Sequence, residues 1–94
     1  MINIEERHLK ALKSILKKYP YKFYAFGSRI KGDNRKYSDL DLCYKENIPT
    51  NVLLDIRDEF ENSDLPFRVD LVFWNHFSNE YKKLISKYLT PIIH

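Results

Sequence analysis

Cysteine is nearly absent from the sequence, since Cys43 is the only one in 94 residues. A single thiol cannot form an internal disulfide, which excludes the small secreted domains that depend on disulfide bridges. No apolar run approaches the roughly 18 residues that a membrane-spanning helix needs, and the first residues lack the apolar core of a signal peptide. We therefore expect a soluble protein of the cytoplasm.

The sequence also has no internal repeat, low-complexity tract or linker. Its length of 94 residues favours a single domain over residues 1–94. Hydrophobic residues make up 44% of the chain and aromatic residues 15%, which indicates a folded domain rather than a disordered one.

The net charge of +3 is unevenly distributed along the chain. Residues 1–45 hold 11 Lys and Arg against 5 Asp and Glu, which gives +6, and residues 46–94 hold 5 against 8, which gives −3. A basic half can attract a phosphate-bearing ligand or an acidic partner. The simpler alternative is that Lys10, Lys13, Lys17 and Lys18 form the solvated face of one helix.

Apolar spacing and punctuating residues predict helices alternating with strands. Asn3 and Glu6 can form a capping box, and the last helix should bury Tyr81, Leu84, Ile85, Tyr88 and Leu89. The predicted elements are a helix from Asn3 to about Lys18, a strand over 22–26, a helical turn opening at Ser28, a strand over 39–44, a helix capped by Thr50 and running to about Asn62, a strand over 67–74, and a helix capped by Ser78 and closed by Pro91. We expect an α/β (α+β) fold, with a small mixed sheet flanked by helices.

Acidic residues interrupt two of the predicted strands. Asp39 and Asp41 should project from one face of their strand, because strand side chains alternate, and such a pair repels unless a positive charge lies between them. A divalent cation with a preference for hard oxygen ligands, Mg²⁺ or Mn²⁺, would remove this repulsion. If the strand of Asp70 pairs alongside, the three acids could serve a two-metal phosphoryl transfer. The alternatives are a capped turn, a single calcium ion or an exposed strand edge.

A glycine-serine turn precedes the acidic pair. Gly27 has no side chain and lets backbone amides approach a phosphate, while Ser28 can donate its hydroxyl to it. Arg29 or Lys31 would add positive charge. An ordinary strand-to-helix turn, bent at glycine and capped by serine, is the alternative.

The stretch "FGSRIKGDNRKYSDLDL" (26–42) combines these features, with ten residues between Ser28 and the Asp39-x-Asp41 pair. It resembles the minimal nucleotidyltransferases of the DNA polymerase beta superfamily, a resemblance that covers nearly the whole chain. The resemblance implies the minimal polymerase-beta-type fold and two Mg²⁺ ions, with Mn²⁺ as an alternative. It implies that Gly27, Ser28, Arg29 and Ser38 bind the nucleotide, and that Asp39, Asp41 and Asp70 are catalytic metal ligands.

The resemblance also implies an activity. Members of this branch often pair with a HEPN-domain toxin and transfer AMP from ATP to one of its tyrosines, as the antitoxin of a type VII-like toxin–antitoxin system. No membrane partner is expected, and nucleic acid is not expected as a direct substrate. Two alternatives remain open: a non-catalytic module that neutralises its partner by contact, and a stand-alone nucleotidyltransferase acting on a small molecule or an RNA end.

The remaining reactive residues show no pattern of their own. His8, His76 and His94 lack metal-ligand spacing and are predicted to lie at the surface. Cys43 lies on the acid-bearing side of its strand, where we expect a buried, inert thiol. Trp74 and Phe77 fit either the core or a partner-docking surface.

Overall fold

The computed structural model describes residues 4–26 and 39–92. The predicted phosphate-binding residues Gly27, Ser28, Arg29 and Ser38 lie outside the described residues, as do the helical turn predicted from Ser28, Asn3 and His94. None of the helices within the described ranges has the length and hydrophobicity to cross a bilayer.

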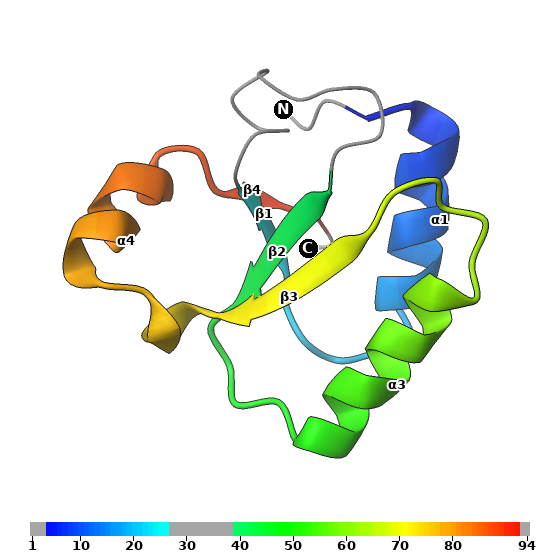
Figure 1. Ribbon diagram of the computed structural model, residues 1–94, viewed down its shortest axis with the longest axis horizontal. Helices are drawn as coiled ribbons and strands as arrows, with labels where there is room; N and C mark the ends of the chain where they lie inside the picture. The colour runs from blue at the N-terminus through cyan, green and yellow to red at the C-terminus, as the bar shows by residue number, and fades with distance from the viewer. Residues whose placement is uncertain (1–3, 27–38, 93–94) are drawn as a thin grey trace.

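A mixed sheet forms the centre of the fold (Figure 1). Among the described residues the sheet has four strands, which lie in the order β3-β2-β1-β4. Strand β1 (Tyr24–Phe26) pairs antiparallel with both β2 (Leu40–Tyr44) and β4 (Thr90–Pro91), whereas β2 pairs parallel with β3 (Val69–Phe73). The expected α+β architecture with a small mixed sheet and flanking helices is confirmed.

Helices α1 (Glu6–Leu16) and α3 (Thr50–Glu61) lie next to each other and cover one face of the sheet (Figure 1). The main core lies beneath them, where Leu40 and Leu42 of β2 are fully buried together with Leu12 and Ile56 of the helices. Alternation along β2 sends its leucines into this core and its other side chains to the opposite face. The four lysines over residues 10–18 are exposed, as the simpler reading of the basic half predicted.

The opposite face is covered by a short 3₁₀ helix, η1 (Trp74–His76), and by α4 (Asn79–Ser86). Ile85 of α4 packs there against Phe26 and Cys43. The prediction that Tyr81 and Leu84 face inward is wrong, because they are 37% and 52% exposed. An eight-residue helix lying on a small area of sheet buries one row of side chains, and the rest of its apolar stripe stays in solvent.

The structure corrects several predicted boundaries. Helix α1 begins at Glu6 with Glu5 as its N-cap, so the predicted capping box from Asn3 is wrong. Thr50 is the first residue of α3 rather than its cap. The cap at Ser78 is confirmed, since its Oγ accepts a hydrogen bond from the Tyr81 backbone N–H at 3.1 Å.

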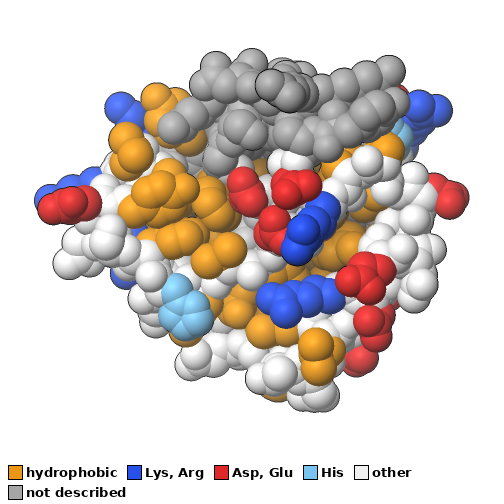
Figure 2. Space-filling model, viewed as in Figure 1, with side chains coloured by type: hydrophobic (Ala, Val, Ile, Leu, Met, Phe, Trp, Pro, Cys, Tyr) orange, Lys and Arg blue, Asp and Glu red, His pale blue; other side chains and the backbone are white. Residues whose placement is uncertain are grey.

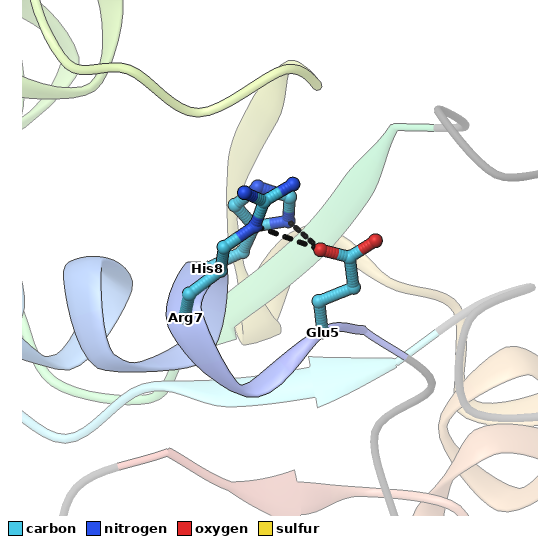
Figure 3. A network of polar contacts seen from close by, with 3 residues as sticks. All are labelled: Glu5, Arg7 and His8. Carbon is cyan, nitrogen blue, oxygen red and sulfur yellow. Dashed lines mark hydrogen bonds and ion pairs between the residues drawn. The ribbon is translucent and has the colours of Figure 1, made fainter.

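A small polar network marks the start of α1 (Figure 3). Glu5 accepts a hydrogen bond from Arg7 Nε at 2.8 Å and lies 3.9 Å from His8 Nδ1. The His8 ring meets Phe67 edge-on, with centroids 5.9 Å apart, so His8 is partly buried and not at the surface as predicted. Exposed ion pairs contribute about 0–1 kcal/mol, so this network orients the helix end more than it stabilises the fold.

Strand β4 was not predicted from the sequence. Pro91, expected to close the last helix, pairs with Tyr24 at the edge of the sheet, and the Ile92 N–H donates to the Phe23 carbonyl at 3.0 Å. Proline is tolerated at an edge because its missing N–H interrupts no ladder there. The strand predicted over 67–74 also ends at Phe73, where η1 begins.

Two substitutions on α3 test where the core lies. We expect Ile56→Ala, at a fully buried position, to lower the free energy of unfolding by about 2–5 kcal/mol. Leu54→Ala, at a position 53% exposed on the same helix, should change it by no more than about 0.5 kcal/mol. Urea unfolding followed by circular dichroism measures both, and similar losses for the two variants would contradict the assignment.

Candidate active site

Two of the predicted acids meet on neighbouring strands. Asp41 of β2 is the register partner of Asp70 of β3, so both side chains leave the sheet on the same face. Asp39 precedes β2 and lies two positions before Asp41, on the same side of the chain. The structure therefore places Asp39, Asp41 and Asp70 on the same face of the sheet, the one that carries α4, opposite the leucine core.

The charges of these acids act on one another. The pKa of Asp41 is raised by burial and, to a smaller extent, by the negative charges of Asp70 and Asp39. Acidic side chains gather in the middle of the face shown in Figure 2, next to a basic side chain. A cation beside Asp41 would offset both the cost of burying its negative charge and the repulsion from Asp70 and Asp39.

The chemistry of these side chains fits a hard divalent ion, because each offers carboxylate oxygens. Within residues 4–26 and 39–92, however, no three His, Cys, Asp or Glu side chains are grouped closely enough to hold a metal ion. Carboxylates with no positive charge between them repel one another. Asp39, Asp41 and Asp70 would therefore have to draw together around the ion.

Arg68 is a neighbour of the acids that sequence reasoning missed. Its Nε lies 3.5 Å from Asp70 Oδ1, and both side chains are well exposed. An exposed ion pair of this kind is weak, so Arg68 does not neutralise the Asp70 carboxylate. Its position beside the carboxylate can still orient it. The spacing of Arg68 and Asp70 could have indicated this contact, because residues two apart on a strand project to the same side.

A pocket of about 520 Å³ adjoins Asp70 on the side of α3. Arg57 and Glu61 of α3 line it together with Arg68, and Phe60 and Phe67 contribute apolar surface. The pocket thus combines charged groups of both signs with aromatic rings, next to one of the three acids.

Aromatic side chains lie on the other side of the acids. Phe26 is the register partner of Asp41 on β1, and its ring centroid lies 6.4 Å from that of Tyr81. Burial raises the pKa of Tyr81, and the negative charge of Asp41 raises it further. The tyrosine that the sequence assigned to the core thus lies within electrostatic reach of the acids.

Cys43 is fully buried on this same face, as predicted. Burial raises the pKa of its thiol to about 11, although Lys45 acts in the opposite direction. The group therefore stays a neutral thiol at physiological pH, which makes it a poor nucleophile and metal ligand.

Removal of one acid should change the titration of its neighbour. We expect Asp70→Asn to lower the pKa of Asp41, because one of the charges that raises it disappears. A raised pKa means that the folded state binds this proton more tightly than the unfolded state, so the contribution of Asp41 to stability falls as pH rises past the ordinary carboxyl range. The variant should lose less stability over that rise.

Carboxyl carbon chemical shifts in metal-free protein measure the first effect, and urea unfolding at a series of pH values measures the second. Asp58→Asn, at an exposed position on α3, is the control. An unchanged Asp41 pKa in Asp70→Asn would show that the two side chains do not interact.

Comparison with known proteins identifies the family of the chain. A sequence profile described as "Nucleotidyltransferase domain" matches residues 5–93. The chain is also 39% identical over 90 residues to a Haemophilus influenzae protein named "Probable protein adenylyltransferase MntA", covering 92% of this chain and 79% of that protein. The chain belongs to the nucleotidyltransferase domain family and is an enzyme that transfers nucleotides.

Proposed function

We propose that this nucleotidyltransferase transfers AMP from ATP to a tyrosine hydroxyl of a HEPN-domain toxin, and so acts as the antitoxin of a type VII-like pair. The observation that supports nucleotide transfer is the register of Asp41 with Asp70, with Asp39 beside them, while the HEPN partner and its tyrosine rest on the family resemblance of residues 26–42. The name of the Haemophilus influenzae relative supports adenylyl transfer to a protein. The cytoplasm, where ATP is abundant, is the compartment we propose.

In the proposed reaction the tyrosine oxygen attacks the α-phosphorus of ATP. A new P–O bond forms, the bond to the β-phosphate oxygen breaks, and pyrophosphate leaves while the phenolic proton is lost. Asp39, Asp41 and Asp70 would hold Mg²⁺, or Mn²⁺, which supplies positive charge where negative charge develops. Asp70, oriented by Arg68, would take up the acceptor proton.

The nucleotide would extend from these acids towards the glycine-serine turn. Gly27, Ser28, Arg29 and Ser38 are the residues we propose for binding its phosphates. Backbone N–H groups, a hydroxyl and a guanidinium are the donors that phosphate oxygens require.

The acceptor would approach from the side of Asp70, because the pocket of about 520 Å³ opens there. Its charged lining, Arg57 and Arg68, suits acidic residues flanking that tyrosine.

Neutralisation of the acids tests the catalytic assignment. We expect Asp39→Asn, Asp41→Asn and Asp70→Asn each to lower adenylyl transfer from labelled ATP by roughly 100- to 1,000-fold, since each removes electrostatic stabilisation. Circular dichroism should show an unchanged fold, and the exposed Asp58→Asn should transfer at the normal rate. Normal transfer by Asp41→Asn would falsify its proposed role.

The fate of the partner distinguishes an enzyme from a contact inhibitor. Co-expression with the candidate HEPN protein should add the mass of AMP to a tyrosine of that protein, and Asp41→Asn should abolish both the added mass and the protection from toxicity. Intact-mass and peptide mass spectrometry measure this. A partner that is inhibited but unmodified would support the non-catalytic alternative.

A further inference from the structure

An aromatic cluster without an assigned role lies beside the acids. It consists of Phe26, Phe77 and Tyr81, and we call it the aromatic wall. The centroid distances are 5.0 Å between Phe77 and Tyr81, 5.3 Å between Phe26 and Phe77, and 6.4 Å between Phe26 and Tyr81. All three pairs meet edge-on, an arrangement that stabilises ring pairs and fixes the orientation of each ring.

Exposure differs along this wall. Phe26 is 5% exposed and belongs to the small core under α4, whereas Tyr81 is 37% exposed at the first turn of that helix. Phe26 and Phe77 therefore hold the Tyr81 ring from inside, while part of the ring remains accessible. An aromatic ring that is fixed on one side and open on the other is suited to receive another flat ring.

The position of the wall relates it to the reaction. Phe26 lies directly across from Asp41 on the neighbouring strand, and neighbouring strands are about 4.8 Å apart. The negative charge of Asp41 contributes to the raised pKa of Tyr81, which agrees with this closeness. In a nucleotide a single ribose separates the base from the α-phosphate. A phosphate over the acids would therefore bring its base towards the wall.

We propose that Tyr81, held by Phe26 and Phe77 beside Asp41, is the platform on which the adenine base of ATP stacks. This inference rests on the proposed function, and it adds a base-binding residue to a site whose other ligands contact only phosphate and metal. Stacking recognises a flat aromatic ring rather than a hydrogen-bonding edge. Tyr81 thus contributes affinity for the nucleoside, and the hydroxyl group is dispensable.

Binding without turnover tests the proposal. The intact chain in excess MgCl₂ is titrated calorimetrically with α,β-methylene-ATP, which cannot transfer its nucleotide, and separately with inorganic triphosphate, which has no base. We expect Tyr81→Ala to weaken binding of the nucleotide analogue by roughly 5- to 150-fold and to leave triphosphate binding unchanged. Tyr81→Phe should bind both ligands normally, because the ring remains.

Leu84→Ala is the matched control, since Leu84 is an exposed apolar residue on the next turn of α4 and lies outside the wall. It should bind both ligands as the unaltered chain does. Equal affinity of the unaltered chain and Tyr81→Ala for the analogue would overturn the proposal, as would an equal loss of both ligands. Failure of the unaltered chain to bind either ligand would overturn the proposed function as well.

Discussion

Two negative charges held side by side on neighbouring strands are the constraint on which the rest of the structure depends. The parallel register of β2 and β3 fixes Asp41 beside Asp70, and partial burial removes some of the solvent that would weaken their repulsion. The opposite face of the same strands is apolar, with Leu40 and Leu42 fully buried under α1 and α3. The core thus stabilises strands whose other face is destabilising without a ligand.

Much of the fold could be predicted because one pattern of residues can indicate both the type of an element and which of its sides is buried. The alternation of acid and leucine over residues 39–44 indicates a strand and also which side is buried. Strand β4 could not be predicted, because a two-residue segment that ends in Pro91 carries no alternating pattern and pairs only where β1 offers an edge. The exposure of Leu84 depends on how much of α4 the sheet covers, which is a tertiary property.

Part of the candidate site could likewise be predicted from local sequence, and part of it depends on tertiary structure. The Asp39-x-Asp41 spacing is local, and strand geometry alone places both acids on one face. That Asp70 lies across from Asp41 depends on the register between strands separated by a helix, which neither strand encodes by itself. Tyr81 was missed for a related reason, because helical periodicity groups it with core residues while the small sheet face leaves its ring accessible.

Asp70 lies on an edge strand of the sheet, and this position has a consequence for association between copies of the protein. Within the part of the chain that the structure describes, β3 and β4 are the outer members of the sheet, and an outer strand can hydrogen-bond to a strand of another copy of the protein. A charged side chain on an edge strand and a proline at an edge both discourage such pairing. Asp70 and Pro91 occupy these positions. The carboxylate at Asp70 therefore disfavours pairing of β3 with another copy of the protein, in addition to the catalytic role proposed for the same residue.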